Sequence, residues 1–212
     1  MDRVTEAQHR IEELYHETHG KCYMSFSGGK DSTVLLALVK QCQELGTIGD
    51  IPAVFSNTGI EMQVTIDFVK WVRSNWYPNV VIIHPEKPFD WVLKNKGKPL
   101  KSKLRSKDLR QWHYGKRSDA LLLLLLRGEY GNDKYSAKHL IADKDMHMIH
   151  DDFPIKPSYE CCNYMKKNPF HKFNKDTGML GCLQGIRIGE GGARETAYER
   201  RILGGGEALH LG

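Results

Sequence analysis

A short glycine-containing turn near the N-terminus gathers side chains that could bind phosphate. The segment 25–33 reads SFSGGKDST and lies between an apolar run and a helix-like pattern. Gly28 and Gly29 let the backbone approach an anion closely, and the N–H groups at a helix start favour negative charge there. Lys30 adds a mobile positive charge. Because Lys30 is followed by Asp31, the spacing differs from the common Gly-x-x-x-x-Gly-Lys-Ser/Thr loop, and the turn predicts another way of holding phosphate.

Asp31 is the unusual member of this turn. A carboxylate beside bound phosphate is repelled unless a cation lies between them, which predicts Mg²⁺ bridging Asp31 and the phosphates. Ser27 and Ser32 add hydroxyl donors. The alternative is an ordinary glycine turn with an Asp or Ser helix cap, which accounts for Gly28, Asp31 and Ser32 but not for the whole set.

The pattern around the turn alternates strands and helices. We expect strands at 21–26, 51–56, 80–84 and 179–188, and helices at 4–18, 34–45, 61–76 and 189–200. Such alternation predicts a three-layer α/β/α sandwich with a mostly parallel, doubly wound sheet. The continuous apolar run at 80–84 indicates a strand buried on both faces. Ligands of such sheets bind beyond the carboxyl ends of the strands, where the glycine turn meets its helix.

The middle of the chain has a looser pattern. Residues 85–157 contain lysine-rich turns at 94–107 and a leucine-rich segment at 118–127. Long insertions of this kind are typical of lids or binding segments. The leucine run is much shorter than the roughly 20 residues that a membrane span needs, so it predicts a buried helix.

Composition limits the class of protein. The 212 residues are 40% hydrophobic and 27% charged, with a net charge of +5. We expect one globular domain over residues 1–212, without a membrane partner. No secretory segment precedes the first helix, and the five cysteines lack a regular framework, so a reducing, cytoplasmic location is expected.

Five motifs in order resemble the PAPS (phosphoadenosine phosphosulfate) reductase-like family of the PP-loop, or adenine nucleotide alpha-hydrolase, superfamily. The first two are Ser25-Phe-Ser-Gly-Gly-Lys-Asp-Ser32, which is similar to the PP-loop, and Asn57-Thr-Gly-Ile-Glu61, which is similar to the [DN]-T-G-x-E segment. The third is Lys98-Pro-Leu-Lys-Ser-Lys103, which is similar to the substrate loop. The last two are Tyr159-Glu-Cys-Cys-Asn163 with Lys166, Lys167 and Pro169, which is similar to the Cys-Cys element, and Gly185-Ile-Arg187 with Glu190 and Arg194, which is similar to the GIR segment.

The resemblance implies an adenine nucleotide, ATP or PAPS-like, together with Mg²⁺ at Asp31. Lys30, Asp31 and Arg187 would be catalytic, while Arg187 and Arg194 would neutralise far phosphates or a sulfate. The residues expected to contact the nucleotide are Ser25, Phe26, Ser27, Gly28, Gly29, Lys30, Asp31, Ser32, Asn57, Thr58, Gly59, Glu61, Ser102, Lys103, Gly185, Arg187 and Arg194.

The sequence departs from the family's pattern in two places. Gly191 replaces the family's serine, and the segment that normally follows, with its redox or cluster cysteines, is expected to be missing after Gly212.

The cysteines leave two interpretations open. Cys161 and Cys162 are adjacent, and adjacent cysteines form only a strained disulfide ring, so they are better interpreted as thiols. With Cys182 they could hold a [4Fe–4S] cluster with one open iron. The alternative is that these thiols only pack or are redox-silent.

Two functions therefore remain. The first is an enzyme that acts at the alpha phosphate of ATP by adenylation with pyrophosphate release, or on a PAPS-like nucleotide in sulfur transfer. The second is a nucleotide-binding accessory subunit of a larger complex that includes nucleic acid or protein. The sequence names neither sulfur donor nor acceptor, and a homodimer is compatible with both. The lysine-rich segment 94–107 is either a solvated loop, a cover for the nucleotide through Ser102 and Lys103, or a surface for a phosphorylated or nucleic-acid acceptor.

Overall fold

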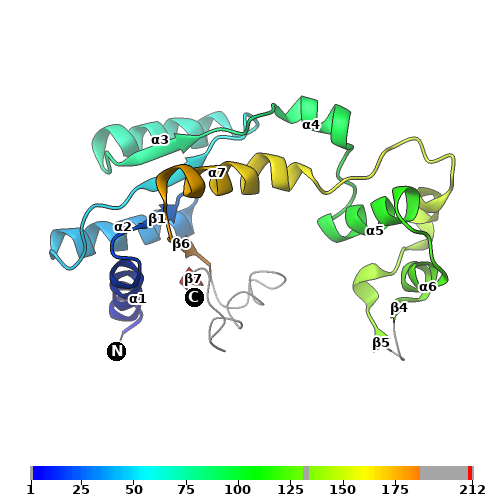
Figure 1. Ribbon diagram of the computed structural model, residues 1–212, viewed down its shortest axis with the longest axis horizontal. Coiled ribbons are helices and arrows are strands. Elements are labelled where there is room, and N and C mark those ends of the chain that lie inside the picture. The colour runs from blue at the N-terminus through cyan, green and yellow to red at the C-terminus, as the bar shows by residue number, and fades with distance from the viewer. Residues whose placement is uncertain (1, 131–133, 187–209, 212) are drawn as a thin grey trace. The chain divides into compact units, whose positions relative to one another are not determined.

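The computed structural model describes residues 2–130, 134–186 and 210–211 (Figure 1). Contacts divide the chain into two compact units. We call Met1–Pro85 with Asn168–Gly212 the sheet unit, and Glu86–Lys167 the helical unit. Each unit has its own buried hydrophobic cluster. The single domain that the sequence predicts over residues 1–212 stays a prediction.

The sheet unit contains a five-stranded sheet in the order β3-β2-β1-β6-β7. Its strands are β1 (Cys22–Ser25), β2 (Ala53–Ser56), β3 (Val80–Ile83), β6 (Gly181–Gly185) and β7 (His210–Leu211). Every neighbouring pair is parallel, with Met24 opposite Ala53 and Leu183 on its two sides. The expected parallel, doubly wound sheet is confirmed.

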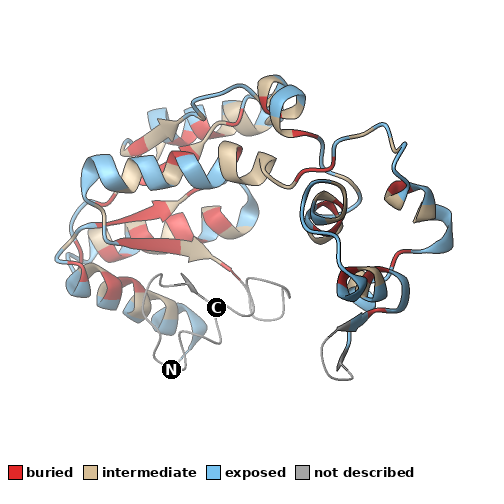
Figure 2. Cartoon of the chain, turned by 45° about the vertical axis from the view of Figure 1, so that its right-hand side comes forward, coloured by how far each residue is buried: buried red, intermediate tan, exposed pale blue. Residues whose placement is uncertain are grey.

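Helices cover both faces of this sheet. They are α1 (Arg3–Glu17), α2 (Lys30–Glu44), α3 (Gln63–Asn75) and α7 (Asn168–Thr177). Successive strand residues point to opposite faces, so Met24 packs in the cluster that includes residues of α1, α2 and α3, whereas Tyr23 packs against Phe170 and Phe173 of α7. Figure 2 shows the buried strands between these helices. The sequence prediction of three layers is confirmed.

Strand β3 differs from its prediction. Only Val80 is buried, and the other three residues of β3 are partly exposed. The reason is its place at the edge of the sheet, next to β2 alone. An apolar run by itself does not distinguish a central strand from a half-covered edge strand.

The helical unit is built from short helices around a small core. Its elements are α4 (Phe89–Lys96), α5 (Lys103–Tyr114), α6 (Asp119–Arg127), the hairpin of β4 (Glu129–Tyr130) and β5 (Lys134–Tyr135), the 3₁₀ turns Ala137–His139 and Asp143–Ile149, and a π-helical turn at Asn163–Lys167. The leucine run forms α6 as predicted, and it buries Leu121 and Leu125. Ser118 Oγ accepts a hydrogen bond from Leu121 N at 3.2 Å, and Gly128, with φ of 72°, ends the helix. None of the described helices is long and apolar enough to span a membrane.

The lysine-rich segment is not the continuous loop that the sequence suggested. It contains the end of α4 at Lys96 and the start of α5 at Lys103. Between them Gly97 adopts φ of 103°, and a Cβ there would lie 2.5 Å from Lys156 O, so only glycine fits. Lys98 N donates to Lys156 O at 2.8 Å, and Ser158 N donates to Lys98 O at 2.9 Å. The turn is therefore fixed to a distant part of the same unit.

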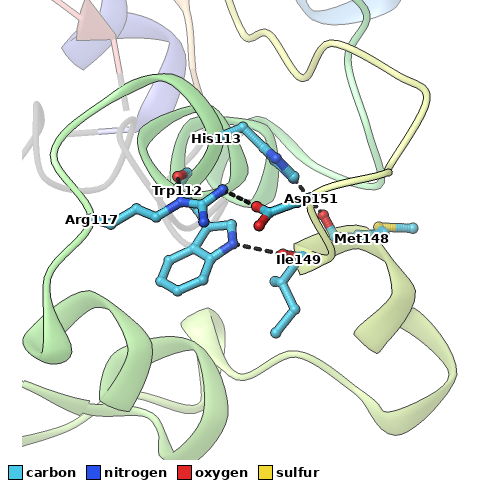
Figure 3. Close-up of polar contacts among 6 residues, drawn as sticks. All are labelled: Trp112, His113, Arg117, Met148, Ile149 and Asp151. Atoms are coloured by element: carbon cyan, nitrogen blue, oxygen red, sulfur yellow. Dashed lines mark hydrogen bonds and ion pairs between the residues drawn. The ribbon is translucent and has the colours of Figure 1, made fainter.

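Helix α5 is fixed on its other side to the 3₁₀ turn Asp143–Ile149 and the residues after it (Figure 3). Trp112 Nε1 donates to Ile149 O at 2.7 Å, and His113 Nε2 pairs with Met148 O at 2.7 Å. Arg117 forms an ion pair with Asp151, and this hydrogen-bonded guanidinium lowers the pKa of the exposed carboxyl. These contacts fix one face of α5 and leave the opposite face to solvent.

Candidate functional site

The glycine turn lies at the carboxyl end of β1, as the sequence predicts. Strand β1 ends at Ser25 and α2 begins at Lys30, with Gly29 at the N-cap position. Phe26 is buried, and its N–H donates to Val54 O at 2.9 Å, which fixes the start of the turn against β2. In this described segment no side chain caps α2. The predicted alternative of an Asp31 or Ser32 cap is thus not what the structure shows, and the helix start presents N–H groups that suit an anion.

Two serine hydroxyls shape the turn from inside. Ser27 Oγ and Ser32 Oγ lie 3.0 Å apart, and Ser32 Oγ accepts from Ser27 N at 3.2 Å. Ser32 Oγ also donates to Gly29 O at 2.9 Å, and Gly29 N donates to Ser27 Oγ at 3.3 Å. The hydroxyls that the sequence assigned to phosphate therefore also hold the backbone of the turn.

Gly28 brings the turn against α3. Its φ is 72°, in the region that favours glycine, and a Cβ would lie 3.1 Å from Thr65 Cγ2 and 3.2 Å from Val69 Cγ2. A side chain at Gly28 would both strain the backbone and push the turn away from α3. The glycine is therefore required by conformation and by packing.

The end of β6 meets the start of α2. The chain runs from β1 through β2 to β3 on one side, and returns as β6 on the other side of β1, so the topological switch point lies between β1 and β6. A Cβ on Gly185 would lie only 3.0 Å from Asp31 O and 3.1 Å from Asp31 C. The structure thus brings Gly185 to the glycine turn, as expected from its motif. Arg187 and Arg194 lie outside the described residues.

The segment after β2 contributes a second tight loop at the same edge of the sheet. Asn57 N donates to Ile83 O at 2.9 Å, and Asn57 Oδ1 accepts from Gly59 N at 3.0 Å. Thr58 is buried, and its hydroxyl donates to Glu61 Oε1 at 2.9 Å. Because parallel strands end at one edge, this loop and the glycine turn lie on the same side of the sheet.

A pocket beside the turn was not predicted from the sequence. It is open, with a volume of about 600 Å³, and is lined by Gly28, Lys30, Thr33, Val34, Val64, Thr65 and Phe68. Its lining is mainly apolar, and Phe68 stacks on Trp71. Apolar residues on the solvent-facing sides of two helices could have indicated this pocket. Val34 and Val64, for example, are 62% and 67% exposed.

The residues near Asp31 fit a magnesium ion that arrives with a nucleotide. Asp31 is in the first turn of α2 and precedes Ser32, whose hydroxyl lies 3.0 Å from that of Ser27. Mg²⁺ is usually bound by one or two carboxylates together with substrate phosphates, so a single carboxylate here is sufficient. The ion would neutralise phosphate charge next to Lys30.

The three cysteines expected to hold a cluster are divided between the two units. Cys161 and Cys162 are partly exposed in the helical unit, whereas Cys182 is buried in β6 of the sheet unit. Burial raises the pKa of the Cys182 thiol. The described parts of the chain contain no group of three His, Cys, Asp or Glu residues that could hold a metal ion. The expected [4Fe–4S] cluster therefore stays a prediction.

Ser102 and Lys103 lie at the start of α5. Ser102 Oγ accepts from Arg105 N at 3.1 Å and caps the helix, which the sequence analysis did not anticipate. Lys103 is the exposed first residue of α5. Their predicted contact with a nucleotide stays a prediction.

Comparison with known proteins finds a similarity over about half of the chain. Residues 21–120 match the family model of the phosphoadenosine phosphosulfate reductase domain. This range includes the glycine turn and the loop after β2. This part of the chain is therefore similar to the PAPS reductase domain.

Two individual proteins are also similar. An uncharacterized protein of Methanocaldococcus jannaschii is 34% identical over 94 residues, which are 43% of this chain and 21% of that protein. The chain thus spans about a fifth of the length of this curated relative. A crystal structure of phosphoadenylyl-sulfate (PAPS) reductase from Candida auris, in complex with phosphate, aligns with a TM-score of 0.43 at 13% identity, covering 88% of this chain and 68% of that chain.

Proposed function

We propose that the carboxyl edge of the sheet unit binds an adenine nucleotide, with its phosphates on the turn Ser25–Ser32. The observation that carries this proposal is the uncapped start of α2 at the switch point, where a Cβ on Gly185 would lie 3.0 Å from Asp31 O. N–H groups at a helix start, two glycines and Lys30 suit a polyphosphate. The backbone of Asn57, Thr58 and Gly59, with Glu61, would meet the ribose or the base.

The intact glycine turn favours ATP as the nucleotide. A full set of two glycines, Lys30, Asp31 and Ser32 offers contacts for the pyrophosphate portion of a triphosphate. An oxygen of an acceptor would attack the alpha phosphorus, and the bond to the bridging oxygen of the pyrophosphate would break. Lys30 and the N–H groups of the turn stabilise the charge that develops on the leaving pyrophosphate. Mg²⁺, when bound at Asp31, supplies further neutralisation.

Arg187 and Arg194 complete the proposal from the motif after β6. Their guanidinium groups would neutralise distal phosphates, or the sulfate of a PAPS-like nucleotide. The second substrate form is therefore a PAPS-like nucleotide in sulfur transfer, which the family supports as a class. The acceptor or donor of sulfur is not part of the proposal.

A second candidate function is a nucleotide-binding accessory subunit without turnover. Gly191 at the place of the family's serine favours it, because one hydroxyl contact is lost. Such a subunit would bind the nucleotide at the same turn as part of a larger complex.

Product analysis separates these functions. Purified protein is incubated with ATP or with PAPS, with and without candidate thiol and nucleic-acid acceptors, and pyrophosphate, AMP and sulfite are measured. Pyrophosphate release that disappears in Lys30→Ala supports the ATP reaction, and sulfite release supports the PAPS reaction. Nucleotide binding without product supports the accessory subunit. Absence of both binding and product contradicts the proposal. An anaerobic absorption spectrum of the same preparation tests the iron–sulfur expectation.

A further inference from the structure

The positive charge of the chain is concentrated in the helical unit. Residues 86–167 contain 18 Lys and Arg residues against 11 Asp and Glu residues, a net charge of +7, although the whole chain has only +5. The sheet unit is therefore slightly acidic. A compact unit with this excess of positive charge attracts polyanions through its summed field.

Helix α5 presents a basic face that ends in an aromatic ring. Lys103, Lys107, Arg110, Gln111 and Tyr114 follow one another at helical spacing, so they share one side of the helix. The opposite side buries Ser106, Asp108 and Leu109. We call the first five residues the α5 face. It is about 16 Å long, a length over which a nucleic-acid strand presents several phosphates.

A small pocket lies at the end of the α5 face. Its volume is about 220 Å³, and it is lined by Lys107, Arg110, Gln111, Tyr114, Gly115 and Tyr159. Tyr114 is 61% exposed, and Lys156 Nζ lies 5.7 Å from the centre of its ring. The pocket lining therefore includes two tyrosines, an amide and the ammonium group of Lys107, and Lys156 lies beside Tyr114.

The charged groups around this pocket differ in whether they form ion pairs. Arg110 Nη2 forms an ion pair with Glu160 Oε1 at 2.7 Å, and Arg110 Nη1 donates to Ser158 Oγ at 3.3 Å. The carboxylate of Glu160 is thus neutralised and does not repel an anion. Lys107 is exposed and forms no ion pair with any described residue. Lys107 and Lys156 are therefore the ammonium groups available to phosphates.

We propose that the α5 face and its pocket bind single-stranded nucleic acid. The exposed ring of Tyr114 and the partly exposed Tyr159 provide stacking surfaces for unpaired bases, and the neighbouring lysines would contact the phosphates, which is the combination that single-strand-binding proteins use. An acidic peptide would contact the lysines but would not need a pocket lined by two tyrosines. Duplexes keep their bases stacked inside and would meet only the lysines. The proposal does not depend on the nucleotide turn of the sheet unit.

Fluorescence anisotropy with labelled single-stranded DNA and RNA of about 12 nucleotides tests the proposal across a salt series. Lys107→Ala combined with Lys156→Ala should weaken binding about tenfold at low salt and reduce the salt slope by about 1.4, since each lost phosphate contact removes about 0.7. Tyr114→Ala should weaken binding at least about fivefold without changing the slope, because stacking releases no counterions. Tyr114→Phe keeps the ring and should bind as the parent does.

Matched controls come from the same unit. Lys138→Ala with Lys144→Ala removes two exposed lysines elsewhere, and Tyr135→Ala removes a tyrosine that is 63% exposed. Both controls should bind as the parent does, and so should Lys30→Ala of the sheet unit. The proposal is overturned if the parent fails to bind at low salt, if the Lys107 and Tyr114 variants behave like their controls, or if Lys30→Ala abolishes binding. Polyglutamate or a duplex that competes as well as the single strand, with Tyr114→Ala unaffected, would also overturn it.

Discussion

At the scale of single residues, Tyr77 connects three segments of the sheet unit through one hydroxyl. Its Oη donates to Ile51 O at 2.5 Å and accepts from Gln43 Nε2 at 2.9 Å, and the side chain is buried. Tyr77→Phe keeps the ring but leaves a buried carbonyl without its donor. We expect the free energy of unfolding at neutral pH to fall by about 1–2 kcal/mol in urea denaturation. An unchanged free energy would mean that water replaces the hydroxyl.

The same hydroxyl predicts a dependence of stability on alkaline pH. Burial raises the pKa of Tyr77 from its ordinary value of 10.0 to about 12. Since the folded state holds this proton more tightly than the unfolded state, the contribution to stability is complete below pH 10 and is lost as the pH rises toward 12. The parent should therefore lose stability more steeply over this range than Tyr77→Phe does. Equal slopes for the two proteins in urea denaturation would contradict the assignment.

At the scale of elements, the two glycines of β6 have different neighbours, so substitution of one should affect nucleotide binding and substitution of the other should affect packing. A Cβ at Gly185 would lie 3.0 Å from the backbone of Asp31, whereas a Cβ at Gly181 would lie 2.8 Å from Leu14 Cδ1 and 2.9 Å from Thr18 Cγ2. Gly185→Ala should displace the start of α2 and weaken nucleotide binding about tenfold. Gly181→Ala, on the same strand, should lower the melting temperature and leave the affinity of the folded protein unchanged. Titration calorimetry and thermal denaturation of both variants check this, and equal affinities would contradict it.

Helix α6 offers a second comparison along one element. Leu125 is fully buried, while its neighbour Leu126 is 39% exposed. Leu125→Ala should lower the free energy of unfolding of the helical unit by about 2–5 kcal/mol, because it leaves a cavity in the core of that unit. Leu126→Ala should cost less than about 1 kcal/mol. Denaturant unfolding followed by circular dichroism measures both. Similar losses would show that the face of α6 is assigned wrongly.

The elements also show what the sequence can predict. The glycine turn between β1 and α2 was predicted from residue types alone, since Gly28 and Gly29 lie between one apolar run that ends at Phe26 and another that begins at Val34. Helix α5 was missed, because its many lysines suggested a solvated loop although lysine is a good helix former. The cap at Ser102 and the buried Leu109 were its signals. The pocket beside Gly28 depends on α3 lying against the turn, which no local pattern contains.

At the scale of the whole molecule, two compact units predict two unfolding transitions. The sheet unit and the helical unit have separate cores, and each core is formed by residues of its own unit. Leu36→Ala, in the core of the sheet unit, should shift one transition, and Leu125→Ala should shift the other. Differential scanning calorimetry of the parent and the two variants checks this. One transition that both substitutions shift together would favour the single domain predicted from the sequence.

The central claim is that the turn Ser25–Ser32 binds the phosphates of an adenine nucleotide, and titration calorimetry with ATP and Mg²⁺ tests it most directly. Lys30 is exposed, so Lys30→Ala should leave the melting temperature of the free protein nearly unchanged while weakening binding at least about tenfold, as expected for losing a charged hydrogen bond to phosphate. Asp31→Ala should weaken binding mainly when Mg²⁺ is present. Lys70→Ala, an exposed lysine on α3, is the matched control and should bind as the parent does. Parental affinity in both the Lys30 and the Asp31 variants would contradict the account.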